Sequence, residues 1–281
     1  MSDVTRLASP EIDLSVPPLG ARRLLGRRTY VAKVSLATCA AVVVLWWLAA
    51  WLEVVPAMFL PSPVAVTAKF FAVSSDGFQD ATLSQHLLAS VGRVIVALGG
   101  AIILGVVLGF AMHVSETARG VVEPLLEFYR PIPPLAYLPL VIIWFGIGEL
   151  AKILVIFLGI LPSIIIATNE GLTSVPHDTV NAARSLGATR LQVIQLVLLP
   201  HALPNIMTGT RIGLGTGWAT LVAAELVAAT RGLGFMIKGA ADFLVTDVVI
   251  LGILVIAAVA IVMELALRLI QRTLAPWQGH Q

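Results

Sequence analysis

Long runs of apolar residues separated by short polar segments dominate this sequence. Six runs stand out, at 34–52, 87–112, 121–145, 150–168, 202–229 and 248–270. Each approaches or exceeds the roughly 20 residues that an α-helix needs to cross the hydrocarbon core of a bilayer. The pattern predicts an all-α membrane protein with about six transmembrane helices. They would form one domain over residues 34–275, between tails at 1–33 and 276–281.

The third run, 121–145, differs from the others because several prolines interrupt it. Pro131, Pro133 and Pro134 directly follow Arg130. Each proline removes a backbone donor and clashes with the preceding helical turn. At membrane depth, such a break is tolerated only against protein or a water-filled cavity. The run is therefore predicted either to line a pathway, with Arg130 and Pro133 as candidate residues, or to be a kinked entry near the membrane surface.

The composition agrees with a membrane location, and the placement of charge gives a topology. Charged residues make up 12 % of the chain, whereas soluble domains carry about 25 %. With the N-terminus in the cytoplasm, eleven Lys and Arg residues fall in the inside segments. Only Lys69, Arg231 and Lys238 fall outside. The excess of positive charge predicts an inner-membrane protein with both termini in the cytoplasm.

Two features inside the runs indicate contacts between helices. Small residues recur every four positions in the second run and in the fifth run: Ala101, Gly105 and Gly109, then Gly209, Gly213 and Gly217. Such rows allow close helix packing, either within the chain or between two copies. Arg211 and Glu225 lie within the fifth run, and Glu225 is the deepest acid without a helix-spaced partner. Both are candidate pathway residues, although Glu225 could equally be a polar contact between helices near the outer surface.

The polar loop at about 171–200 separates the fourth and fifth runs, and the charge pattern places it in the cytoplasm. Ser174 is expected to cap a helix whose first turn contains Pro176, and Gly187 is expected to end that helix. Ala182 and Ala183 give the helix a small-residue face that a partner can approach closely. A short helix with so few large apolar groups would be unstable alone in water, which indicates a docking partner.

A second helix is predicted directly after this turn. Thr189 and Gln192 have the spacing of a capping box, in which each residue caps the other's backbone. The helix that they open is expected to end at Pro200, because proline breaks a helix interior.

These residues carry a resemblance to a known family. Asn181-Ala182-Ala183, then Gly187 after three residues, then Val197-x-Leu199-Pro200 after nine more, resembles the EAA loop of ABC importer permeases. That pattern reads E-A-A, three residues, G, nine residues, I-x-L-P. Asn181 replaces the family Glu, which removes a charge, and Val197 replaces Ile. The stretch 130–149 resembles the nitrate/sulfonate/taurine permease subfamily, and 211–225 and 229–247 most resemble its taurine permeases.

The resemblance implies a type I ABC importer permease fold, also called MetI-like, and a set of partners. Two permease copies would form the path, two ATP-binding subunits would bind below, and a periplasmic binding protein would deliver the substrate. ATP would be bound by the partner subunits, so this chain would need no cofactor. The cargo would be a small organic anion, first taurine and then other alkanesulfonates or nitrate. The residues that would couple to the ATPase are Asn181, Ala182, Ala183, Leu186, Gly187 and Ala188.

Other classes of function find less support in the sequence. There is no GxxxxGK[ST] loop, so the chain is not expected to be an ATPase itself. No catalytic or metal-binding pattern such as HExxH or GxSxG appears, which disfavours a membrane enzyme. A secondary transporter remains the alternative of a different class, although the sequence has neither an internal repeat nor an acidic relay. Arg184 and Arg190 are too few basic residues for the loop to bind nucleic acid.

Overall fold

The first part of the chain is a single long helix. The computed structural model describes residues 21–276, and the chain divides into two compact units, Met1–Val55 and Pro56–Gln281. The first unit contains α1 (Ala21–Trp51), whose apolar part, Lys33–Trp51, is long enough to cross a membrane. This helix begins inside the segment predicted as a tail. The other tail residues, 1–20 and 277–281, lie outside the described part of the chain.

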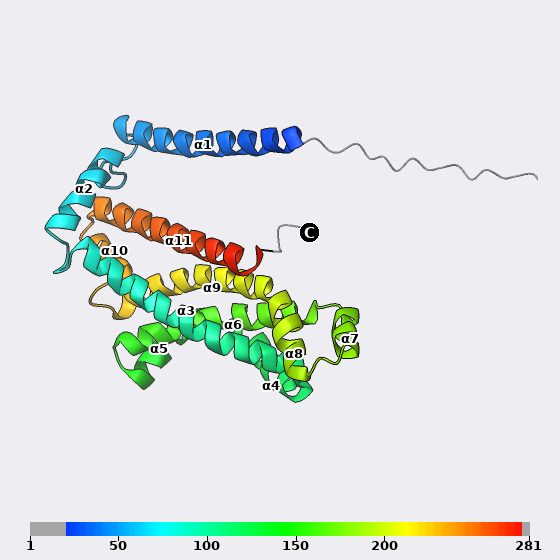
Figure 1. The fold of residues 1–281 in the computed structure, drawn as a ribbon. Coiled ribbons are helices and arrows are strands. Elements are labelled where there is room, and N and C mark those ends of the chain that lie inside the picture. Colours follow the sequence, from blue (N-terminus) through cyan, green and yellow to red (C-terminus); the bar gives the residue numbers. More distant parts are fainter. Residues whose placement is uncertain (1–20, 277–281) are drawn as a thin grey trace, which may run out of the picture. The chain divides into compact units, whose positions relative to one another are not determined.

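The second unit is built from helices, and its longest helices run between its two ends (Figure 1). They are α2 (Pro63–Ser75), α3 (Leu83–Val114), α4 (Glu116–Tyr129), α5 (Pro134–Phe145), α6 (Glu149–Thr173), α7 (His177–Ser185), α8 (Arg190–Val193), a π-helical segment η1 (Ile194–Leu198), α9 (Leu199–Ala228), α10 (Leu233–Asp242) and α11 (Thr246–Leu274). In the described residues of both units, five helical stretches are long and apolar enough to cross a membrane, or six if α4 and α5 count as one span bent by 106°. The predicted number of spans is confirmed, and the proline-rich third span is the broken one.

Helix α6 lies at the centre of the second unit, between α3 and α9. The predicted rows of small residues make these contacts possible. A Cβ on Gly105 of α3 would lie 2.8 Å from Ile164, and one on Gly209 of α9 would lie 2.3 Å from the Cβ of Ala167. Both rows therefore pack against α6 within the same chain. Ile156, Ile160 and Ile164 of α6 are fully buried in the core that results.

Helices α8, η1 and α9 form one continuous span, Arg190–Val227, so the prediction that a helix ends at Pro200 was wrong. The turn before Pro200 widens into a π-helix, where the N–H of Leu199 donates to the carbonyl of Ile194, five residues earlier. A π turn changes the backbone spacing at the place where proline lacks a donor and its ring crowds the preceding turn. The chain thus continues through Pro200 as a helix.

The two ends of the second unit carry different small helices. Helices α2 and α10 lie at one end, and α7 and α8 lie at the other (Figure 1). Helix α10 packs against α9 and α11, and α2 packs against α11, with Lys69 placed 3.6 Å from Asp247. We call these the α10 end and the α7 end.

Candidate functional site

Helix α7 follows α6 almost directly. Ser174 belongs to the end of α6, because its N–H donates to the carbonyl of Glu170 and its hydroxyl donates to the carbonyl of Gly171 at 2.8 Å. The prediction that Ser174 caps α7 was therefore wrong. Pro176 occupies the N-cap position, and no side chain caps the first turn.

The turn after α7 has the predicted form. Gly187 has a left-handed φ of 85°, and its N–H donates to the carbonyl of Arg184 at 2.9 Å, while the N–H of Ala188 donates to that of Ala183 at 3.1 Å. This pair of bonds is the Schellman motif, which favours glycine at the left-handed position. Thr189 and Gln192 form the expected capping box that opens α8. Local backbone rules thus account for both sides of the turn.

Helix α7 has one face that lines a cavity and an opposite face that is exposed. His177, Val180, Asn181 and Arg184 recur at helical spacing and line a cavity of about 490 Å³ between α7 and the ends of α3, α4 and α6. Ala182 and Leu186 lie on the opposite face, and Leu186 is 89 % exposed. No residue of α7 is buried. The predicted coupling residues therefore all lie between positions 181 and 188, but Asn181 faces the cavity while Leu186 faces away from it.

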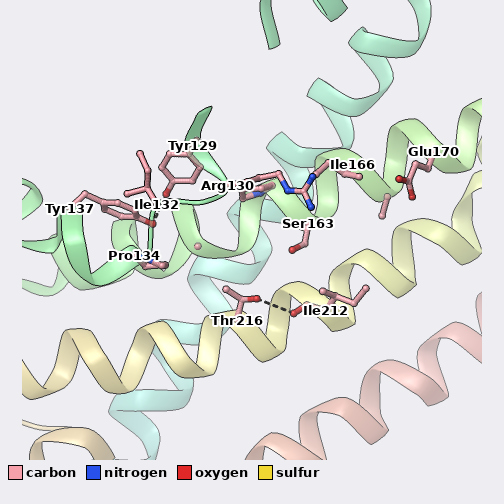
Figure 2. Close-up of a pocket in the computed structure, with 13 residues that line it drawn as sticks. Tyr129, Arg130, Ile132, Pro134, Tyr137, Ser163, Ile166, Glu170, Ile212 and Thr216 are labelled. Carbon is pink, nitrogen blue, oxygen red and sulfur yellow. Dashed lines mark hydrogen bonds between the residues drawn. The ribbon is translucent and has the colours of Figure 1, made fainter. Parts of the chain in front are cut away.

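A second cavity, of about 320 Å³, lies beside the break between α4 and α5 (Figure 2). Its polar lining comes from Arg130 at the break, Ser163 and Glu170 on α6, and Thr216 on α9. The hydroxyls of Tyr129 and Tyr137 also line it and hydrogen bond to each other across the bend. A helix break in a membrane requires such a neighbouring cavity or protein surface. Arg130 is the predicted pathway residue that lines this cavity, and Pro133 directly precedes the lining residue Pro134.

The other two pathway candidates are held in ion pairs elsewhere. Arg211 is paired with Glu264 of α11 at 3.0 Å. Glu225 is fully buried and accepts a hydrogen bond of 2.5 Å from Arg93 of α3, which agrees with the alternative of a polar contact between helices. The partner lies 132 residues earlier in the sequence, where no helix-spacing rule could find it.

Arg93 and Glu225 belong to a network at the α10 end. Arg93 also donates to both carboxylate oxygens of Glu149, at 2.6 and 2.8 Å, and Lys152 donates to Glu149 at 2.6 Å. Glu225 additionally accepts bonds from the hydroxyl of Ser90 at 2.7 Å and the N–H of Gly234 at 2.8 Å. The buried charges are thus paired and hydrogen bonded, as burial requires. The network ties α3, α6, α9 and α10 together.

Close backbone approach completes this network. Gly232 has a φ of 141°, and a Cβ there would lie 2.4 Å from the carboxyl carbon of Glu225. The carbonyl of the preceding Arg231 accepts a bond from Arg93 at 2.8 Å. Sequence reasoning missed Arg93 as a central residue. The available signal was an arginine within an apolar run, which is costly unless a partner compensates it.

Comparison with known proteins identifies the family. Residues 101–277, more than half of the chain, match the family described as "Binding-protein-dependent transport system inner membrane component". The chain belongs to this family. The permease resembles the taurine transport system permease protein TauC of Escherichia coli K12, with 51 % identity over 265 residues that cover 93 % of this chain and 96 % of the relative.

Other relatives carry different names. A putative aliphatic sulfonates transport permease protein, SsuC of Bacillus subtilis, is 35 % identical and covers 92 % of each chain. The nitrate import permease protein NrtB of Synechocystis is 31 % identical and covers 77 % of this chain and 81 % of its own.

Solved structures agree on the fold. An inward-facing MetNI methionine ABC transporter chain superposes with a TM-score of 0.57 at 21 % identity, covering 68 % of this permease and 95 % of that chain. A chain of an amino acid ABC transporter crystallised with histidines gives 0.53 at 18 % identity, covering 76 % and 95 %. The predicted MetI-like fold is confirmed.

The family decides between the alternatives left open by the sequence. The permease is a multi-pass membrane subunit of an ABC importer, and ATP is hydrolysed by a separate subunit. The alternative of a secondary transporter was therefore wrong.

Proposed function

We propose that the permease carries taurine into the cell. Support comes from the 51 % identity over 93 % of the chain with a relative named as a taurine permease. Relatives named for aliphatic sulfonates and nitrate are more distant, at 35 % and 31 % identity. Alkanesulfonates and nitrate are the alternative cargoes.

Two copies of the permease would form the path, with two ATP-binding subunits and one periplasmic binding protein. The assembly lies in the inner membrane. Both termini and α7 are on the cytoplasmic side, an orientation that the distribution of Lys and Arg favours. Helix α7 is the coupling helix. Its outward face has small Ala182 and a large apolar group, Leu186, with 89 % of its surface exposed. A buried leucine contributes about 1.5–3 kcal/mol, so a partner that covers Leu186 gains substantially.

The cavity beside the α4–α5 break is the proposed segment of the path. Arg130 supplies positive charge for a sulfonate, and Ser163 supplies a hydroxyl donor. The hydroxyl of Thr216 also lines the cavity and donates to the carbonyl of Ile212 at 3.4 Å. Glu170 also lines it, which suits the amino group of taurine better than it suits nitrate. Pro133 adjoins the lining and would let the broken span flex.

Transport in reconstituted vesicles tests the cargo. The permease would be assembled with its ATP-binding and substrate-binding subunits, and accumulation of labelled taurine would be measured with and without ATP. We expect accumulation only with ATP, and weak competition from excess nitrate. Accumulation of nitrate or an alkanesulfonate without taurine would reject the proposed cargo, and accumulation without ATP would reject the mechanism.

Leu186→Ser tests the coupling role of α7. Residue 186 has a negative φ of −81°, which serine also adopts, so the change removes apolar contact without straining the chain. We expect binding of the ATP-binding subunits to weaken about tenfold, which corresponds to about 1.4 kcal/mol, and uptake to fall accordingly. Retention of the subunits on the purified permease would measure the first effect.

Leu274→Ser is the matched control. Leu274 is 49 % exposed at the last residue of α11, and its loss should leave subunit binding unchanged. If both variants lost the same amount of subunit binding, the result would contradict a special role for α7 in coupling.

A further inference from the structure

The cavity behind α7 has an unusual charge balance. Its ionisable lining residues are His113, Arg119, His177, Arg184 and Arg190, and no Asp or Glu lines it. Its apolar floor comes from Leu172, Val175 and Val193, which are all buried. The cavity therefore combines a positively charged lining with an apolar floor.

The three arginines lack the carboxylate partners that Arg93, Arg211 and Arg268 possess. In the described residues, Arg93, Arg211 and Arg268 each form an ion pair with a glutamate within 3.0 Å. Within the same residues, no carboxylate lies within ion-pair distance of Arg119, Arg184 or Arg190. Like charges gathered without compensation repel one another, so an anion at this place would relieve their repulsion.

Two further observations point to a missing partner. The Nδ1 atom of His113, a lining residue, is buried without a hydrogen-bond partner. Asn181 lines the same cavity at the position where the EAA pattern has a glutamate. The amide at this position brings no negative charge, so the chain does not neutralise the arginines internally.

We propose that this cavity binds a phosphate-type tetrahedral oxyanion, held by Arg119, Arg184 and Arg190. The planar guanidinium group presents paired N–H donors that match such an anion. The volume of about 490 Å³ lies within the usual range of small-ligand pockets. The site goes beyond the transport function and does not depend on the identity of the cargo.

The bound anion would join three elements that are otherwise loosely connected. Arg119 lies on α4, Arg184 on α7 and Arg190 on α8. Because α7 buries no residue of its own, an anion at this place braces the helix from behind and leaves Leu186 on the outward face. The phosphate group can come from an anionic phospholipid or from free phosphate in solution.

Thermal unfolding of the complete permease with its ATP-binding subunits tests the site. In maltoside micelles, which contain no phosphate, the unfolding midpoint would be followed with inorganic phosphate and with chloride at equal ionic strength. In a second arm, phosphatidylglycerol would be compared with a glucosyl diacylglycerol of the same chains. We expect a rise in the midpoint with the phosphate-bearing probe in at least one arm.

Three variants locate the effect. Arg184→Gln combined with Arg190→Gln should weaken the apparent affinity for the active probe about tenfold or more. Asn181→Glu should abolish the response, because the new carboxylate occupies the site, and should raise the midpoint in chloride. Arg268→Gln on α11, whose arginine is paired with Glu264, is the control and should respond as the original chain does.

The arms separate the sources of the anion. A response to inorganic phosphate alone identifies a free anion, and a response to phosphatidylglycerol alone identifies a lipid headgroup. No response in either arm, or an undiminished response in the double variant, overturns the proposal. Loss of the ATP-binding subunits from the double variant, without any response of the original chain to either probe, also overturns it and assigns the arginines to the subunit interface.

Discussion

The two ends of the helical unit treat charge in opposite ways. At the α10 end, Arg93 and Glu225 are 4 % and 0 % exposed, and their hydrogen bonds are satisfied within the chain. At the α7 end, Arg184 and Arg190 remain on the surface, and neither has a carboxylate partner in the described residues. At the α10 end, the chain itself supplies the partners of its buried charges. At the α7 end, a carboxylate or other anionic partner for these arginines would have to come from another molecule.

The difference separates stability from assembly. Removing one partner of a buried ion pair leaves a charge without compensation, which is among the largest single-residue effects known. Changing an exposed group costs the isolated chain little. We therefore expect substitutions at the α10 end to affect folding and those at the α7 end to affect binding and transport.

Arg93→Met carries the largest expected effect. It leaves Glu225 buried without a cation and removes both bonds to Glu149. The expected loss is about 3–5 kcal/mol of stability, seen as a lower unfolding midpoint or little recoverable protein. Arg211→Met is the control, because its partner Glu264 keeps a second ion pair with Arg268 at 2.6 Å, so its loss should cost less. Equal losses of stability in the two variants would mean that the buried network does not stabilise the permease more than the Arg211–Glu264 pair does.

Gly209→Ala tests whether the bundle between the two ends is tightly packed. The new Cβ would lie 2.3 Å from the Cβ of Ala167 and 2.8 Å from the carbonyl oxygen of Ser163. Overpacking of this kind costs about 1–3 kcal/mol. Gly215→Ala on the same helix meets no atom within 4 Å, so it should be neutral or slightly stabilising. Unfolding midpoints of the two variants that coincide would contradict close α6–α9 contact.

Gly187→Val has the smallest expected effect on folding and a large one on transport. A β-branched residue at a φ of 85° costs about 1–2 kcal/mol, which the exposed turn after α7 absorbs by rearranging. The unfolding midpoint should hardly change, while ATP-dependent uptake falls about tenfold. Gly187→Asn should retain most of the uptake, because asparagine tolerates the left-handed region. A Gly187→Val variant with normal uptake would remove α7 from the coupling mechanism.

Local features were predictable from the sequence because their causes are local. The Gly187 turn and the Thr189–Gln192 capping box depend on residues within five positions of one another. The apolar runs gave the spans because bilayer thickness fixes their length. Pro200 was misjudged, because the π turn that accommodates it leaves no mark in the sequence pattern.

Long-range features could not be predicted in the same way. Glu225 finds Arg93 across 132 positions, and only the packing of α3, α6 and α9 around each other brings them together. The two faces of α7 were also unforeseen. The motif gave six candidates between positions 181 and 188, but a helix distributes neighbours around its circumference, so Asn181 turns toward the cavity and Leu186 away from it.

The π turn has a mechanical consequence. From Arg190 to Val227 the backbone is one strut of 38 residues, rising about 1.5 Å with each residue. One tip adjoins the Gly187 corner, and Glu225 sits near the other. Because no loop interrupts this segment, a displacement at its first end can reach the second end as tilt or rotation, unless the π turn at Ile194–Leu198 takes it up by twisting.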